Sequence, residues 1–359
     1  MTIIDRYLFR RLAAALAKAL LALVALYVLV DLLTHRDDAI LRYDVAWPVV
    51  ARYYLDLVPQ VVYRVAPLAL LVSALLVLGD SAQHNEITSA LAGGISLRRF
   101  CRAPVVLALA FAAGLFVMEE TVGVRATQRA IRVENTYFLQ KLDTGRGGIS
   151  WANLSGDWTC HMAKFNRLAL TGENVFIHSI RKDAIEQIEA RRIFWDETQG
   201  KWFLEDGVWM VFDAGVTTRS ATRITQCPAP FSETPQELFA LTAPPETKTV
   251  RQLAADIAAA SARGMPVKRA WVDFHAKFAQ PALCFVMVGL AIPFAVRLRR
   301  GGLAVSFGAS IVIAIVYLVL FNVCMTLGHA ERLSPVVAAW LPNAVFLGGG
   351  VGLFLKTPT

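Results

Sequence analysis

The chain has 359 residues, of which 56% are hydrophobic and only 18% are charged, and its mean hydropathy is +0.48. This composition excludes an ordinary soluble domain and is typical of a protein with several membrane spans. The formal charge of +8 is compatible with either nucleic acid or an anionic membrane surface, so the positions of the charges must decide between them.

Six charge-poor segments are long enough to cross a membrane as helices, because about 20 apolar residues span the hydrocarbon core. Arginines precede the first segment, but it is longer than the apolar core of a secretory signal, so we expect it to be retained as a helix. The segments are residues 12–33, 57–78, 103–124, 278–296, 301–328 and 333–355. They predict three spans, a long insertion and three further spans.

Basic residues in the short loops predict the orientation of the spans. Ten of these basic residues fall on the side of the membrane where the N-terminus is predicted to lie: Arg6, Arg10, Arg11, Arg98, Arg99, Arg102, Arg297, Arg299, Arg300 and Lys356. The opposite short loops hold Arg36, Arg42, Arg52 and Arg332. Both termini are therefore predicted to be cytoplasmic and residues 125–277 to lie outside. Because topology explains the excess positive charge, nucleic acid is not expected as a partner.

Residues 125–277 are expected to form a folded β domain on helical flanks. Strands are predicted at 174–180, 189–195, 201–204 and 208–212, with turns at 171–174, 197–200 and 205–207. No long helix fits among them, which favours an antiparallel sandwich or jelly roll.

The flanks of this domain are predicted to be helical. The third span is expected to continue outward to about Leu142. Thr249 and Gln252 have the spacing of a capping box at the start of a second helix, which Gly264 and Pro266 end.

Motifs for catalysis or metal binding are absent from the sequence. The five cysteines have no zinc-binding spacing, and no P-loop, H-E-x-x-H or G-x-S-x-G motif occurs. No metal, cofactor or catalytic residue is therefore predicted. Cys160 and Cys227 are a candidate disulfide on the outer side, and two unpaired thiols are an equally good interpretation.

Charged residues within spans are functional candidates by default. Lys18, Asp31, Glu119 and Glu120 lie near the ends of their spans, where side chains reach the interface, and are interpreted as structural. Arg64 lies about two helical turns inside its span and is retained as a candidate.

The loop between the second and third spans is patterned as a short cytoplasmic helix over residues 81–92. Asp80 or Ser81 can cap it, Ile87 and Leu91 share one side, and Glu86 is expected to face outward. Such a helix would give a soluble partner a docking point, and a simple connecting turn is the alternative interpretation.

Short stretches along nearly the whole chain carry a family resemblance. They are Ile4-Asp5-Arg6-Tyr7-Leu8, Val30-Asp31-Leu32-Leu33, Asn85-Glu86-Ile87, Ala92-Gly93-Gly94-Ile95-Ser96, Lys201-Trp202-Phe203-Leu204, Lys277-Phe278-Ala279-Gln280-Pro281 and Leu341-Pro342-Asn343. In this order, on a three plus three topology around an outer β domain, they resemble the LptF/LptG permeases of the lipopolysaccharide exporter. The helix at 249–263 inclines the resemblance toward LptG.

The resemblance implies an α-helical, multi-pass protein of the Gram-negative inner membrane. Its spans would lie in residues 1–124 and 278–359, around a periplasmic antiparallel β-jellyroll domain in residues 125–277. The chain would be a non-enzymatic half-transporter that pairs with a second LptF/LptG permease. It would extract lipopolysaccharide from the outer leaflet and pass it along the β-jellyroll bridge of LptC and LptA. An LptB ATPase dimer would supply the energy, and the ATP and magnesium would belong to that dimer, not to this chain.

The resemblance also implies roles for particular residues. The helix at 81–92 would couple to the ATPase, with Glu86 as the principal contact. The supporting coupling residues would be Ser81, His84, Ile87, Leu91, Arg98 and Arg99. Contact with lipid A phosphates would come from Arg36, Arg42 and Arg64.

Other functions remain open on the residues alone. They are a membrane-anchored periplasmic binding or scaffolding module, a secondary lipid carrier and an intramembrane hydrolase. A patterned cytoplasmic helix argues against a mere anchor, and the lack of a charged relay argues against a carrier. No paired nucleophile and base was found for a hydrolase.

Overall fold

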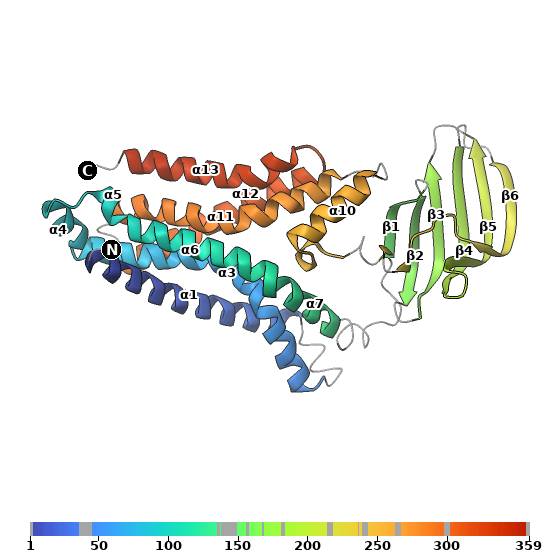
Figure 1. Cartoon of the computed structure of the whole chain (residues 1–359), viewed down its shortest axis with the longest axis horizontal. Coiled ribbons are helices and arrows are strands. Elements are labelled where there is room, and N and C mark those ends of the chain that lie inside the picture. Colours follow the sequence, from blue (N-terminus) through green and yellow to red (C-terminus); the bar gives the residue numbers. More distant parts are fainter. Residues whose placement is uncertain are drawn as a thin grey trace. The chain divides into compact units, whose positions relative to one another are not determined.

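A computed structural model of the chain shows two compact units (Figure 1). The first unit comprises residues 1–134, 245–261 and 266–359, and the second comprises residues 135–244 and 262–265. The structure describes residues 3–35, 45–134, 137, 149–155, 158–166, 169–180, 184–213, 218–235, 237–238, 243–262, 267–297 and 302–356.

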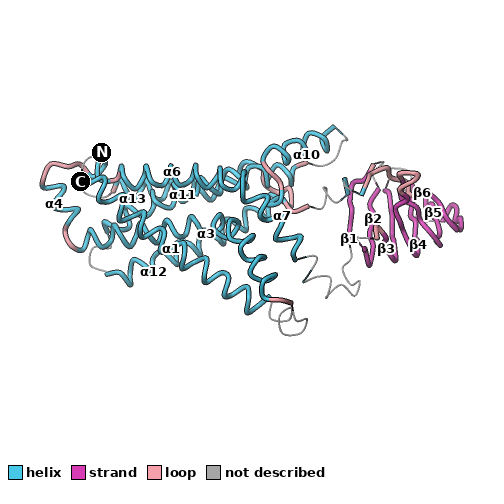
Figure 2. The backbone as a smooth tube through the Cα atoms, turned by 60° about the horizontal axis from the view of Figure 1, so that its bottom comes forward, coloured by secondary structure: helices cyan, strands magenta, loops and turns pink. Residues whose placement is uncertain are grey.

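The first unit is helical (Figure 2). Its first half contains α1 (Ile3–His35), α3 (Trp47–Gln83), α4 (Glu86–Ala92), α5 (Leu97–Phe100), α6 (Arg102–Met118), the π-helical η1 (Glu119–Gly123) and α7 (Val124–Val133). Its second half contains η3 (Pro245–Thr247), α10 (Val250–Ala262), α11 (Lys268–Arg297), α12 (Gly302–His329) and α13 (Pro335–Leu355). Six of its helices are long and apolar enough to cross a membrane. The predicted six spans are therefore confirmed for the described residues.

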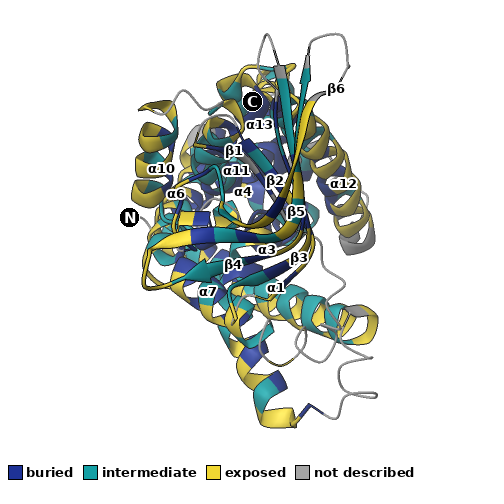
Figure 3. Ribbon diagram, turned by 90° about the vertical axis from the view of Figure 1, so that its right-hand side faces the viewer, coloured by how far each residue is buried: buried dark blue, intermediate teal, exposed yellow. Residues whose placement is uncertain are grey.

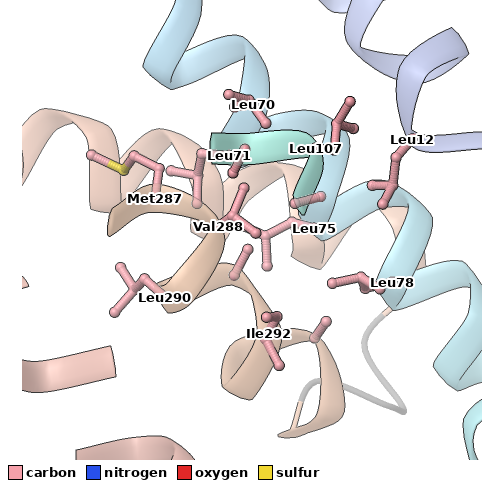
Figure 4. Packing of buried hydrophobic residues seen from close by; sticks show 14 of the residues in the cluster. Leu12, Leu70, Leu71, Leu75, Leu78, Leu107, Met287, Val288, Leu290 and Ile292 are labelled. Carbon is pink, nitrogen blue, oxygen red and sulfur yellow. The ribbon is translucent and has the colours of Figure 1, made fainter. Parts of the chain in front are cut away.

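Helices α3 and α11 form the centre of this unit. In each, 67% of the most apolar window is buried, against 6% in α1 and 22% in α12, and Figure 3 shows much of α12 exposed. Leucines of α3 such as Leu71 and Leu75 meet Met287 and Val288 of α11 in the packed core (Figure 4). Because lipid tails are as apolar as leucine, van der Waals packing, rather than escape from water, stabilises such contacts inside a bilayer.

One proline in α11 leaves a backbone carbonyl without its usual donor, and a side chain of another helix bonds to that carbonyl. Pro281 of α11 has no N–H to give to the carbonyl of Lys277, four residues earlier. The hydroxyl of Tyr63 on α3 donates to that carbonyl at 3.2 Å. Nearby, Asn343 of α13 accepts from the Tyr317 hydroxyl at 2.9 Å and donates to the carbonyl of Ala279 at 2.8 Å. These bonds join four helices, α3, α11, α12 and α13, through polar side chains.

The second unit is an antiparallel β sheet. Its strands are β1 (Ile149–Leu154), β2 (Trp158–Asn166), β3 (Thr171–Ile180), β4 (Ala184–Asp196), β5 (Lys201–Asp213) and β6 (Thr218–Pro228). They form one six-stranded sheet in the order β1-β2-β3-β4-β5-β6, so each described strand pairs with its neighbours in sequence. Alternate residues enter a core that includes Trp151, Ile177, Ile188 and Trp202. The expected class, a helical membrane protein with an inserted antiparallel β domain, is confirmed.

Two predicted turns are wrong, and each contains a glycine. Strand β5 continues through residues 205–207, and β3 already begins at Thr171. A Cβ on Gly207 would lie 2.4 Å from the carbonyl oxygen of Glu189, and one on Gly172 would lie 2.3 Å from the Met162 sulfur. These glycines are therefore required by close packing rather than by a turn. The turn predicted at 197–200 is confirmed.

The helical flanks agree with the local sequence signals as far as they are described. Helix α10 starts with the predicted capping box, because Gln252 N donates to the Thr249 hydroxyl at 3.2 Å and Thr249 N donates to the Gln252 side chain at 2.9 Å. The third span runs through α6, η1 and α7 to Val133. Its expected end near Leu142 lies outside the described residues.

Candidate functional site

The short helix α4, the start of α1 and the end of α13 lie at the same end of the helical unit (Figure 1). Asn85 precedes α4 with φ of 59°, and Gly94 follows it with φ of 83°. Glycine adopts this left-handed region freely because it has no Cβ, and asparagine tolerates it better than most residues because its short polar side chain can hydrogen-bond locally. The two residues separate α4 from α3 and from α5. A seven-residue helix of its own therefore connects the second and third spans.

This helix is shorter than the predicted segment at residues 81–92. Ser81 belongs to the last turns of α3 and is fully buried, so it cannot belong to a docking surface. Ile87 is also buried and packs in the core that contains Leu97 and Phe100. Its role is to anchor α4 on the bundle. The amphipathic pattern was correct for α4, but the predicted start was too early because α3 continues to Gln83.

The exposed side of this region contains several of the predicted coupling residues. His84 and Arg99 are exposed, and Leu91 is half-buried. Arg98 lies in α5, and the structure does not describe its side chain. The Ser96 hydroxyl accepts from the backbone of Arg99 and caps α5. His84, Leu91 and Arg99 therefore remain candidates for contact with a soluble protein.

Glu86, the principal candidate, is held by side chains of the first span. Arg11 Nη1 lies 3.4 Å from Glu86 Oε2, and Arg11 Nη2 lies 2.5 Å from Asp80 Oδ2. The Tyr7 hydroxyl accepts from Arg11 at 2.9 Å and donates to Glu86 Oε1 at 3.3 Å. We call Tyr7, Arg11, Asp80 and Glu86 the Arg11 cluster. It joins α1, the end of α3 and the first residue of α4.

The expectation that Glu86 simply faces outward therefore needs correction. Its side chain is 37% exposed, so one part is available to a partner while its oxygens contact Arg11 and Tyr7. Tyr7 and Arg11 are four residues apart on α1 and so lie on one face of that helix. No local sequence signal connects them with Glu86, which lies 75 residues after Arg11.

A second candidate site is a cavity of about 520 Å³ within the helical unit. Its apolar wall includes Leu283, Met287, Leu318, Phe321 and Met325. Its polar wall includes Gln60, Arg64, Glu119, Glu246, Asp273 and Lys277. The cavity thus has the dual character that an amphiphilic ligand requires.

Arg64 is the predicted lipid-contacting residue that lies at this cavity. Its Nη2 is 3.4 Å from Glu246 Oε1, and both side chains are 49% exposed. A half-exposed ion pair is weak, so the guanidinium can exchange its partner. Arg36 and Arg42, the other predicted contacts, lie outside the described residues.

Glu119 and Glu120 are the residues whose importance sequence reasoning missed. Glu119 is 5% exposed, and its Oε2 has no hydrogen-bond partner among the described groups. Glu120 accepts from the backbone N–H of Val250 at 2.9 Å, and its carboxylate lies 3.8 Å from Lys277 Nζ. It therefore fastens the start of α10 to the third span. The π-helical geometry of η1, common at functional sites, places both carboxylates.

The candidate disulfide is not formed in this structure. Cys160 on β2 and Cys227 on β6 are both free thiols. The sheet order places three strands between β2 and β6, so strand pairing does not bring the two residues together. Burial raises the pKa of the Cys160 thiol to about 12, which keeps it protonated and unreactive near neutral pH.

A comparison with protein families returns one finding that covers almost the entire chain. A family model described as "Lipopolysaccharide export system permease LptF/LptG" matches residues 6–356. The match includes all six spans and the β domain. A search among curated proteins returned no match.

Proposed function

The chain belongs to the LptF/LptG family of lipopolysaccharide export permeases, and from that premise we propose that it is one half of an ATP-driven exporter. It would pair with a second LptF/LptG permease in the inner membrane. A cytoplasmic LptB-type ATPase dimer would bind ATP and magnesium and drive both permeases. The sequence supports an external energy source, since it contains no P-loop.

The single observation that carries the coupling proposal is the position and construction of α4. It is a separate short helix between two spans, anchored by buried Ile87. Its neighbours His84 and Arg99 are exposed. Glu86 begins it and remains partly accessible. A helix of this kind can contact a soluble ATPase on one side and the bundle on the other. A passive membrane anchor has no use for it.

The helical unit also supports a lipid substrate. Little of α1 and α12 is buried, and their exposed residues include many large apolar side chains. These faces suit contact with acyl chains of lipopolysaccharide. Arg64 lies on the wall of the amphiphilic cavity, where a lipid phosphate would replace Glu246 as its partner. We therefore propose that Arg64 contributes to binding of the anionic head group.

The β domain would receive the extracted lipid on the periplasmic side. Strands β1 and β6 are the two edges of the described sheet, and exposed edge groups can pair with a strand from another domain. We propose that LptC and LptA continue the bridge through such domains. This orientation requires the termini and α4 to be cytoplasmic, as the basic loop residues predict.

Reversing the charge of Glu86 tests the coupling role. We expect Glu86→Lys to assemble with its partners but to lower lipopolysaccharide export about tenfold or more, the scale of a lost interfacial charge pair. Export and ATP hydrolysis would be measured together in proteoliposomes. Because a lysine would also repel Arg11, Glu86→Gln is needed beside it and should show the same defect more weakly.

Glu197→Lys is the matched control, because Glu197 is an exposed residue of the β4–β5 turn. It makes the same charge change away from α4 and should export normally. Full export by a stably assembled Glu86→Lys complex would remove Glu86 from the coupling site. Export without any ATPase would instead favour a secondary carrier.

A further inference from the structure

Arg11 connects three helices through one guanidinium group. It reaches Asp80 near the end of α3 and Glu86 at the start of α4, and it contacts Tyr7 one turn earlier on α1. Its guanidinium also lies over the Tyr7 ring, 5.3 Å from the ring centre. Arginine keeps its charge at all physiological pH values and has N–H groups on both terminal nitrogens. It can therefore hold two carboxylates at once.

The surroundings of Arg11 differ from those of a simple surface ion pair. The side chains of Arg11, Asp80 and Glu86 are 30%, 27% and 37% exposed, so all three are partly buried. Arg10, the next residue on α1, is exposed and makes no ion pair within the described part of the chain. The adjacent arginine thus has the same charge without the same connections.

The backbone conformation on both sides of α4 makes these side-chain contacts important for the movement of α4. Residues in the left-handed region, Asn85 and Gly94, stand on both sides of α4, so neither α3 nor α5 continues into it as a rigid rod. A force on α4 is therefore transmitted by side-chain contacts as well as by the chain. Arg11 and Tyr7 supply such contacts to α1, the least buried of the six spans.

We propose that Arg11 is a positioning residue that transmits movement of α4 to the first span and so links ATP hydrolysis to lipid export. This inference rests on the proposed function, since it assumes that an ATPase acts on α4. In this role Arg11 acts through Glu86 and Asp80 and touches neither nucleotide nor lipid. Tyr7 supports it by bridging Arg11 and Glu86 with its hydroxyl.

The test measures lipopolysaccharide exported per ATP hydrolysed by the complete complex in proteoliposomes. For Arg11→Gln we expect this ratio to fall about tenfold, within the usual range of coupling between sites. The ATPase rate should stay within about twofold of wild type, a change well below that coupling. Arg10→Gln makes the same charge change on the same helix and should keep the wild-type ratio. A purely structural Arg11 would instead lower the yield or melting temperature of the complex and leave the ratio unchanged.

Further variants show whether Arg11 acts through Glu86. In the double variant Arg11→Gln/Glu86→Gln, the ratio should fall no further than in the worse single variant, because each substitution breaks the same contact between Arg11 and Glu86. Tyr7→Phe removes only a hydroxyl and should lower the ratio partially. This variant keeps the inference testable if the Arg11→Gln complex does not assemble. Arg11→Lys should restore only part of the ratio, since an ammonium lacks the paired N–H groups.

Two results would overturn the inference. One is a wild-type ratio for Arg11→Gln, or for Tyr7→Phe if Arg11→Gln fails to assemble. The other is additive loss in the double variant. Failure of the proposed function would be recognised separately, because the wild-type complex itself would then show no ATP-dependent export.

Discussion

At the scale of single residues, a polar side chain of one helix bonds to a backbone carbonyl that a proline leaves without a donor in another helix. Tyr63 is the clearest example, because its hydroxyl bonds to the Lys277 carbonyl that Pro281 leaves without its usual donor. Because Pro281 leaves the Lys277 carbonyl without a donor in its own helix, the bond comes from another helix. The pair joins the two most buried spans, α3 and α11.

This arrangement predicts a dependence between Tyr63 and Pro281. Tyr63→Phe should lower the free energy of unfolding by about 1 kcal/mol, the usual net contribution of one hydrogen bond. In a Pro281→Ala background the same change should cost less, since the substituted alanine would restore the N–H that the Lys277 carbonyl lacks. Thermal unfolding of the detergent-solubilised protein measures both costs. Equal costs in the two backgrounds would show that the hydroxyl does not serve the freed carbonyl.

The roles of some charged residues were predicted from the sequence, whereas the partners of others were not. Glu86 was identified because the pattern of the loop predicted it to face outward from a short helix and because the family resemblance gives its position a coupling role. Arg11 and Glu120 have partners that are distant in sequence, Glu86 and Val250. A single sequence contains no sign of such pairs. The charges near the ends of spans were therefore interpreted as structural, and only the fold shows which elements they connect.

At the scale of elements, local signals predicted the helices well and the strand boundaries less well. Apolar length located all six spans, and the Thr249 capping box located the start of α10. The turns assigned to Gly172 and Gly207 were wrong, since a glycine required by close packing resembles a glycine required by a turn. Asp206 precedes Gly207, and an Asp-Gly pair is typical of turns. In the structure Asp206 does have a turn-like φ of 51°, but it lies inside β5.

The packing role of Gly207 predicts a strong effect of a small change. Gly207→Ala would place a methyl group against the backbone of β4, at Glu189 and Ala190, which cannot move without breaking the sheet register. We expect it to destabilise the β domain by about 1–3 kcal/mol, the cost of overpacking. Tryptophan fluorescence of the domain, with Trp202 in its core, measures the unfolding.

Gly348→Ala is the control for this change. Gly348 lies in α13 with no atom within 4 Å of the added methyl group, so the substitution should leave stability unchanged or slightly higher, because alanine is the better helix former. If Gly207→Ala melts like the wild type, residues 205–207 have more room than a continuous β5 allows, and the predicted turn would deserve a second test.

At the scale of the whole molecule, the chain contains the parts that one half of a lipid exporter needs. The spans have exposed apolar faces, the amphiphilic cavity includes Arg64, and α4 is the contact that we propose for an ATPase. The family match over residues 6–356 assigns these parts to one protein type. The sequence predicted this organisation because span length, loop charge and motif order are local patterns that can be read along the chain. Contacts between residues that are distant in sequence, such as Arg11 and Glu86, are visible only in the folded structure.

The most direct test of this account is purification of the tagged, full-length chain from its native membrane in mild detergent. The co-purifying proteins would be identified, and ATP hydrolysis and bound glycolipid would be measured on the same sample. We predict recovery of a cytoplasmic ATPase dimer, a second six-span permease and lipopolysaccharide. Recovery of the chain alone, with no ATPase activity and no glycolipid, would contradict the account and favour a membrane-anchored scaffold.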